Sequence, residues 1–229
     1  PDWQAHLGVN YQYVIHPNDA TGAPVGVATP NRYPSQLRDR PELRLDGTRL
    51  VDTGAIDSRH TSVLGLEGAF LTGPFTVESE WFRYKIDRRF ITATTLPDPH
   101  FTGWYIQGGW MLTGESRVYN AVEARIDAPK LNYSFNPEAG TWGAFELVGR
   151  YSDLNLNYHA GAAGAAATAP GAIRGGEQKI YTLGLTWYLN PSLKVMADVQ
   201  HVNIDRLGAT GLQIGQSFNT VAARGQVSF

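Results

Sequence analysis

Arginine is the residue type with the clearest chemistry in this chain, and it is concentrated in one stretch. Residues 15–60 contain as many arginines as acidic residues, namely Arg32, Arg38, Arg40, Arg44, Arg49 and Arg59 against Asp19, Asp39, Glu42, Asp46, Asp52 and Asp57. Guanidinium groups bind phosphate and carboxylate groups through paired hydrogen bonds. Two interpretations stay open: arginines that bind an anion, or a solvated loop whose arginines pair with its own acids.

The other residue types that commonly carry chemistry form no recognisable site. The chain has no cysteine, and its six histidines show no metal-ligand spacing. It contains no nucleophile elbow, phosphate loop or dinucleotide-binding glycine pattern. Basic residues are frequent in 83–89, but a run of charge at a strand end is typical of a solvated surface. We therefore expect no enzyme, no metal and no cofactor.

Composition restricts the class of protein. The 229 residues are 42% hydrophobic and 17% charged, with a net charge of −2, which excludes a disordered chain and argues against a nucleic-acid binder. The longest charge-free run, residues 154–173, is rich in Gly, Ala and Asn and does not resemble a membrane-spanning helix. The chain opens at Pro1, and we expect a mature chain or an internal fragment.

Apolar and polar side chains alternate with period two along about eight stretches of roughly 8 to 12 residues, which predicts β-strands. The stretches are 3–13, 61–70, 75–81, 104–112, 145–152, 181–189, 193–200 and 220–229. All charged residues within them share the polar parity: Glu67, Glu78, Glu80, Glu146, Arg150, Lys194, Asp198 and Arg224. His6 has the same parity, and we predict that these residues line the wall of a pore.

Such alternation fits a soluble sandwich or a barrel in lipid, and three features favour lipid. Aromatic residues on the apolar parity lie near the ends of the stretches, as in aromatic belts. Tight connections at 72–74 and 190–192 contrast with long ones at 15–60, 83–103, 153–179 and 202–219. The polar parity is rich in small residues and in Thr and Gln. We predict an all-β fold, an antiparallel transmembrane β-barrel.

One connection departs from this scheme. Residues 113–140 join two stretches on the side of the tight turns, where a short connection is expected. A weak strand near 117–126 would break the up-and-down order of the other strands. We interpret 113–140 as a long periplasmic connection folded into the lumen, and 15–60 as a long extracellular loop that folds into the pore.

Several motifs together resemble the phosphate-selective porin family, porin O and P. They are GWYIQ at 103–107 with LTGE at 112–115, WGAFEL at 142–147 with RYS at 150–152, RPE at 40–42 with DGTRLVDTG at 46–54, and the terminal Phe229. The resemblance implies a sixteen-stranded, trimeric barrel in the Gram-negative outer membrane. Eight strands would then form its C-terminal half, and residues 1–229 form a single barrel domain or that half.

The resemblance also implies where anions bind. The family's constriction is lined by basic residues on in-folded loops, which match Arg38, Arg40, Arg44 and Arg59 here. A second family stretch is similar to residues 125–130 and implies Arg125 and Lys130, although the acid Asp127 lies between them. The wall carries five acids against three bases, so any preference for anions must come from these loops.

We therefore expect an outer-membrane porin for small hydrophilic solutes, with anions such as phosphate preferred. Its expected partners are membrane lipid, lipopolysaccharide and two further copies in a homotrimer, without nucleic acid. One alternative is a closed eight-stranded structural or adhesion barrel whose interior is filled by side chains. Glycines on the polar parity, such as Gly8 and Gly184, argue mildly against a filled interior. A second alternative is a soluble sandwich that binds carbohydrate.

Overall fold

The structure, a computed structural model, describes residues 3–24, 27, 29–43, 47–89, 95–167 and 169–228. Eight long strands account for most of them: β1 (Trp3–Val14), β5 (Ile56–Thr72), β6 (Phe75–Arg88), β7 (His100–Met111), β12 (Ala144–Tyr158), β13 (Ile173–Asn190), β14 (Leu193–Asp205) and β15 (Ser217–Val227). Each predicted stretch coincides with one of them, apart from end residues. The all-β prediction is confirmed.

The remaining elements are short and lie in the connections. They are β2 (Pro34–Ser35), β3 (Arg38–Asp39), β4 (Val51–Asp52), β8 (Tyr119–Asn120), β9 (Arg125–Ile126), β10 (Phe135–Asn136), β11 (Thr141–Trp142) and the 3-10 helix η1 (Pro137–Ala139). In the described part of the chain, no helix is long and apolar enough to cross a membrane.

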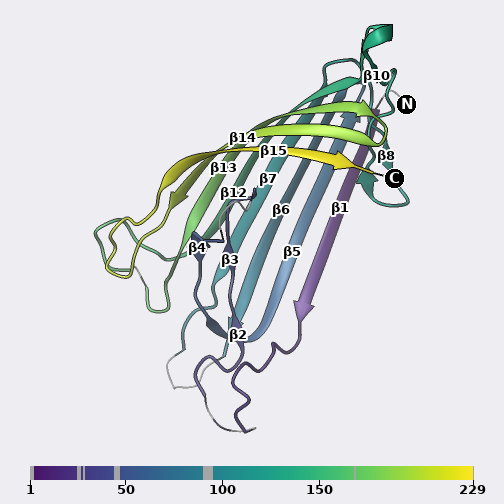
Figure 1. Cartoon of the computed structure of the whole chain (residues 1–229). Coiled ribbons are helices and arrows are strands. Elements are labelled where there is room, and N and C mark those ends of the chain that lie inside the picture. The colour runs from purple at the N-terminus through teal and green to yellow at the C-terminus, as the bar shows by residue number, and fades with distance from the viewer. Residues whose placement is uncertain are drawn as a thin grey trace.

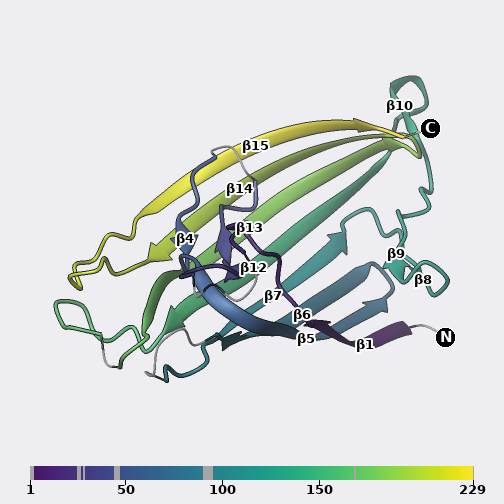
Figure 2. The same ribbon diagram turned by 90° about the horizontal axis from the view of Figure 1, so that it is seen from below.

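The long strands form one antiparallel sheet in the order β1-β5-β6-β7-β12-β13-β14-β15. This order follows the sequence, so every strand pairs with its chain neighbours. The sheet curves into an open trough with β1 along one rim and β15 along the other (Figures 1 and 2). The described residues of β1 and β15 do not pair with each other, so a closed eight-stranded barrel is not observed. The size of a complete barrel stays a prediction.

Tight turns and long connections lie at opposite ends of the trough. The turn after β5 needs Gly73, whose φ is +50°, and the turn after β13 is closed by the Asn190 side chain, which accepts bonds from the amides of Ser192 and Leu193. The described residues that lead out of the strands into the connections 15–55, 89–99, 159–172 and 206–216 lie at the other end (Figure 1). We call these the tight-turn end and the long-loop end.

The exposure of side chains on the two faces of the sheet is the reverse of that in a soluble protein: apolar side chains are exposed and polar side chains are buried. On the convex face, Leu7 is 88% exposed and Val221 is 72% exposed. On the concave face, Glu146 and Gln200 are each 2% exposed. No second sheet covers the apolar face in the described residues, which argues against the soluble sandwich. An apolar outer face and a polar inner face are typical of a barrel in lipid.

Aromatic contacts form two bands on the convex face, as belts at two membrane interfaces do. Near the tight-turn end the contacting pairs are Trp3–Phe70, Phe75–Trp110 and Phe145–Trp187, with ring centroids 6.1, 5.9 and 5.7 Å apart. Toward the long-loop end they are Trp104–Tyr151, Tyr151–Tyr181 and Tyr181–His201, at 5.1, 4.8 and 6.3 Å. Apolar side chains such as Leu183 lie between the bands.

Beyond the second band, the alternation changes phase. In β6, Arg83 and Lys85 take the convex parity, whereas Phe82, Tyr84 and Ile86 take the concave one. Concave apolar side chains of this kind form a buried core at the long-loop end: Ile56, Ile86, Phe101, Leu156, Ile173, Ile180, Val202 and Ile204. The strands therefore extend several residues further than predicted at the long-loop end. Their end residues are stabilised by this core, in which the apolar side chains lie on the concave face instead of the convex one.

That core is covered from inside the trough by part of the first long connection. We call residues 34–43 and 47–55 the inner-loop segment; it contains β3 and β4, which pair with each other within the concavity (Figure 2). Val51 is fully buried in the core, and Leu37 and Leu50 pack against it. Burial of these side chains draws the segment onto the concave face.

Candidate functional site

The candidate site is the concave face of the trough together with the segments that lie on it. By strand alternation, the nine predicted pore-wall residues point to this face: His6, Glu67, Glu78, Glu80, Glu146, Arg150, Lys194, Asp198 and Arg224. They lie between the core at the long-loop end and the tight turns. Several of them make side-chain contacts that the sequence does not reveal.

Arg150 is the most extensively bonded wall residue. Its Nε lies 3.1 and 3.2 Å from the two carboxylate oxygens of Glu42, and its Nη1 donates to Oε1 of Gln107 at 2.8 Å. The guanidinium carbon lies 3.8 Å from the centre of the Tyr105 ring. Gln107 in turn donates to Glu78 at 3.0 Å. Arg150 and Glu42 therefore form an ion pair that joins the wall to the inner-loop segment in the middle of the concave face.

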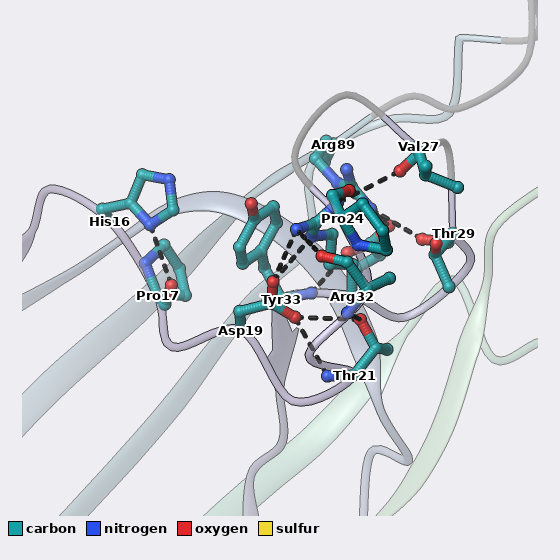
Figure 3. A network of polar contacts seen from close by, with 12 residues as sticks. His16, Pro17, Asp19, Thr21, Pro24, Val27, Thr29, Arg32, Tyr33 and Arg89 are labelled. Atoms are coloured by element: carbon teal, nitrogen blue, oxygen red, sulfur yellow. Dashed lines mark hydrogen bonds and ion pairs between the residues drawn. The ribbon is translucent and has the colours of Figure 1, made fainter.

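The arginine-rich connection contains one enclosed network, centred on Arg32 (Figure 3). Arg32 is 4% exposed; it donates to Asp19 at 2.8 Å and to the carbonyl groups of Pro24, Val27 and Ala23 at 2.6 to 3.2 Å. Four bonds to one planar guanidinium close this part of the loop on itself.

Asp19, the carboxylate that pairs with Arg32 in this network, has a strongly perturbed pKa. The backbone N–H of Thr21 above all, then its hydroxyl group and Arg32, lower the pKa of Asp19 to about 2. Asp19 therefore stays ionised and bound to Arg32 well into the acidic range. Arg32 is thus occupied structurally and is not available to an anion.

Two further acids of the same connection, Asp57 and Asp52, also have side-chain partners. Asp57 accepts bonds from Arg89 at 2.8 and 3.2 Å and from the amide of Tyr33, so it joins the arginine-rich connection to the end of β6. Asp52 accepts a bond from Gln36 at 2.7 Å. Four acids of 15–60, namely Asp19, Glu42, Asp52 and Asp57, thus have side-chain partners other than the arginines of the inner-loop segment.

Those arginines remain without a side-chain partner in the described residues. Arg38 is exposed in β3, Arg40 is half-buried two residues later, and Arg49 is exposed before β4. Asp39 in the same segment likewise has no described side-chain partner. Arg38 and Arg40 lie on the portion of the connection that covers the concave face, where the sequence resemblance places anion-binding residues.

The other two arginines proposed for this loop differ from that pattern. Arg59 was expected just before the strand, but it lies within β5, at a bulge between Ser58 and His60, and it is exposed. The extra apolar residue Ile56, buried in the core, starts the strand earlier than the alternation predicted. Arg44 lies outside the described residues.

The connection between β7 and β12 crosses the concave face near the tight-turn end. Arg117 donates from Nη2 to Glu146 at 2.6 Å and to the Tyr188 hydroxyl at 2.5 Å, and that hydroxyl donates to Glu146 at 2.7 Å. The hydroxyl of Tyr119 lies 2.8 Å from Nδ1 of His6. We call residues 112–127 the crossing segment, because it contacts both β1 and β12–β13.

The crossing segment also contains Arg125, one of the two residues implied by the second family stretch. Arg125 is exposed and forms ion pairs with Glu123 at 2.7 Å and Asp127 at 3.0 Å. Lys130 is exposed and has no described side-chain partner. The charge of Arg125 is therefore largely compensated locally, and Lys130 lies outside the crossing segment. Their role at a constriction stays a prediction.

The contact of His6 completes the wall on the side of β1. Its Nε2 lies 3.0 Å from Glu67, so His6 joins Tyr119 to the wall. Among the described residues, no three His, Cys, Asp or Glu side chains are grouped as metal ligands.

Sequence reasoning missed four residues that hold segments onto the concave face: Arg117, Tyr119, Tyr188 and Arg206. Arg206 donates to the carbonyl groups of Leu50 and Asp52 at 3.0 and 3.3 Å and so fixes the inner-loop segment from its other side. The only available signal was the concave parity of Tyr188, because the others lie in connections with no periodicity.

An antiparallel sheet with an apolar outer band, two aromatic belts and a polar concave face is typical of outer-membrane β-barrel proteins, the class to which porins belong. A family model described as "Phosphate-selective porin O and P" matches residues 3–229, and the chain belongs to this family. Its location is accordingly the bacterial outer membrane.

Two curated relatives are similar to this chain, and one of them is named as a porin. Porin O of Pseudomonas aeruginosa is 28% identical over 218 residues, which cover 88% of this chain and 44% of that protein. An uncharacterized protein of Caulobacter vibrioides is 27% identical over 203 residues, covering 85% of this chain and 36% of that protein. The chain thus spans less than half the length of either relative.

Proposed function

We propose that this chain contributes the wall and the selective loop of an outer-membrane channel through which small hydrophilic solutes diffuse passively, with anions preferred and phosphate among them. The family and the relative named Porin O support a channel. The preference for anions is the finer part of the proposal and needs positive charge that reaches the aqueous path.

One observation carries that part. In the inner-loop segment, Arg38 and Arg40 have no side-chain ion pair among the described residues, whereas Glu42 and Asp52 are occupied by Arg150 and Gln36. Unpaired guanidinium groups near the aqueous path can replace part of the hydration shell of an anion by charge-assisted hydrogen bonds.

The wall supports this assignment of roles. One of its acids, Glu146, is compensated by Arg117, which also holds the crossing segment in place. Glu67, which is hydrogen-bonded to His6, and Glu78, Glu80 and Asp198 remain as acidic groups on the concave face. The wall therefore supplies no anion-attracting field of its own, and the inner-loop arginines must supply it.

The assembly is also proposed rather than observed. Unpaired backbone groups along β1 and β15 would be costly in lipid, so both edges need partners. We propose that further strands complete a sixteen-stranded barrel, that three such barrels assemble, and that the convex face contacts lipid and lipopolysaccharide. Analytical ultracentrifugation of the natural full-length protein in detergent tests the trimer.

The reversal potential of the natural full-length protein in a planar bilayer under a salt gradient tests the selectivity. We expect an anion-directed potential and block of the chloride current by added phosphate. The double variant Arg38→Ala/Arg40→Ala should lose most of both effects. Arg83→Ala removes an arginine from the convex parity and should leave both unchanged.

Three outcomes would each overturn a different part of the proposal: the anion preference, the role of Arg38 and Arg40, or the channel itself. A cation-directed or unselective potential in the wild type would retain the channel and remove the anion preference. A double variant as selective as the wild type would remove the role of Arg38 and Arg40. Absence of any conductance would overturn the channel itself.

A further inference from the structure

We infer that Arg150 is a positioning residue of the proposed anion site: through Glu42 it holds the inner-loop segment in the lumen and keeps Glu42 away from Arg38 and Arg40. This inference rests on the proposed function for its effect on selectivity, but the contact itself is a feature of the fold. Arg150 does not need to touch the passing ion.

The contact joins distant parts of the chain at a defined point. Glu42 and Arg150 are 108 residues apart, and both Glu42 oxygens lie within 3.2 Å of Arg150 Nε. Their side chains are 28% and 25% exposed, so the pair is partly withdrawn from water. Screening at such a site is weaker than at a fully exposed pair.

Arg150 is held from the wall side as well. Gln107 on β7 accepts a 2.8 Å bond from Nη1, and Tyr105 on the same strand lies beneath the guanidinium group at 3.8 Å. Gln107 is itself oriented by its bond to Glu78 on β6. The guanidinium group is therefore fixed by two neighbouring strands, and Glu42 binds to a preorganised partner.

The rest of the inner-loop segment shows why this contact matters. Leu37 and Val51 pack on the core, and Arg206 binds the carbonyl groups of Leu50 and Asp52. These contacts lie before Arg38 or close to β4. After Arg40, the segment is attached to the wall by the hydrogen bonds between Glu42 and Arg150.

Glu42 is also an alternative partner for the two arginines, in addition to Asp39 between them and Asp52 opposite Arg38. It follows Arg40 by two residues and Arg38 by four, so a released loop would allow it to pair with either. Pairing with Arg150 satisfies the carboxylate on the wall and leaves the inner-loop arginines positive. One contact thus holds the segment in position and compensates the charge of its Glu42 carboxylate from the wall.

The sign of a single substitution separates this role from simple electrostatics. If Glu42 were only a negative charge in the lumen, Glu42→Ala would strengthen the anion preference. If it holds the segment in place, Glu42→Ala weakens that preference because the arginines leave the aqueous path. Asp39→Ala is the matched control, since it removes an acid of the same segment with no described side-chain partner and should strengthen the preference.

The test uses the natural full-length protein in planar bilayers and measures the phosphate concentration that half-blocks the chloride current. We expect this concentration to rise about threefold to tenfold in Glu42→Ala and in Arg150→Gln, as for the loss of a partly buried charge-assisted bond. The combined variant should be no worse than the more severe single variant, because both substitutions remove one contact. Arg224→Gln removes a wall arginine without a described partner and should have a smaller effect than Arg150→Gln.

Exchange of the two residues provides a rescue. Glu42→Arg combined with Arg150→Glu rebuilds the pair with reversed polarity and should recover part of the wild-type phosphate block. A stronger anion preference in Glu42→Ala, or additive effects of the two single substitutions, would overturn the inference.

A distance measurement distinguishes failure of the inference from failure of the proposed function. Because residues 1–229 contain no cysteine, spin labels can be attached in this part of the protein at Leu43→Cys and Val148→Cys. We expect a narrow distance distribution that broadens in Arg150→Gln. An unchanged distribution would overturn the positioning role, whereas broadening without a change in selectivity would overturn only the function proposed for Arg38 and Arg40.

Discussion

Arg117 donates a 2.6 Å hydrogen bond to Glu146, and this contact fixes the crossing segment to the wall of the trough. The side chain of Glu146 is 3% exposed and that of Arg117 is 20% exposed, so both charges are largely removed from water. Tyr188 bonds to both residues and completes the cluster. A buried carboxylate of this kind is tolerated because its partners are in place.

Arg117→Ala should therefore lower the free energy of unfolding by about 2–3 kcal/mol, because it leaves the Glu146 carboxylate buried with only the Tyr188 hydroxyl. Urea titrations followed by the heat-modifiable gel shift of the folded protein measure this. Adding Glu146→Gln should recover part of the loss, since the uncompensated charge is removed. The control Arg125→Ala breaks exposed ion pairs and should cost no more than about 0.5 kcal/mol.

Leu7→Arg tests the inverted exposure of the sheet. Leu7 is 88% exposed on the convex face, and an arginine on the lipid face of a barrel costs about 2–4 kcal/mol at the middle of the bilayer. A urea titration of the protein in lipid vesicles, followed by the gel shift of the folded form, should show this loss in the free energy of unfolding. Gln12→Arg places the same group on the concave parity of β1 and should be nearly neutral. Equal effects of the two variants would contradict the assignment of the faces.

Gly143→Ala tests the entry into β12. Gly143 has a φ of +73°, and a Cβ atom there would lie 2.1 Å from the carbonyl oxygen of Tyr188 on β13. Both the strain and the close approach should destabilise the protein, by about 2 kcal/mol or more. Gly149→Ala in the same strand is the control, because no atom lies within 4 Å of its added Cβ. A stable Gly143→Ala variant would show that the strand junction can move.

The network around Arg32 should resist acid. The pKa of Asp19 is lowered from 3.8 to about 2, so its ionised form is favoured in the folded loop. Its contribution to stability is complete above pH 4 and is lost as the pH falls through about 2. Pepsin cleavage within residues 17–33 should therefore remain slow at pH 4 and accelerate toward pH 2. In Asp19→Asn cleavage should already be fast at pH 4, and a similar rate in wild type would contradict the prediction.

The alternation of side chains was sufficient to predict the eight strands and, within the predicted stretches, the face on which each side chain lies. Period two is a local property, and charged residues such as Glu78 and Arg150 can occupy only the face that water reaches. Alternation predicted the strand ends less well. Ile86 and Val202 belong to a core that also includes Val51 of the inner-loop segment, a contact between parts of the chain that are distant in sequence.

The sequence by itself determined the antiparallel sheet, its inverted faces, the aromatic residues of its two belts and the arginine-rich connection. Only the tertiary structure decided which arginines are occupied. Arg32 binds Asp19 within one loop, but Glu42 binds Arg150 across 108 residues, and no local pattern encodes a contact of that separation. Equal numbers of arginines and acids in 15–60 allow many pairings, and the curvature of the sheet, with the core beneath β3 and β4, selects among them. That selection leaves Arg38 and Arg40 unpaired in the described structure.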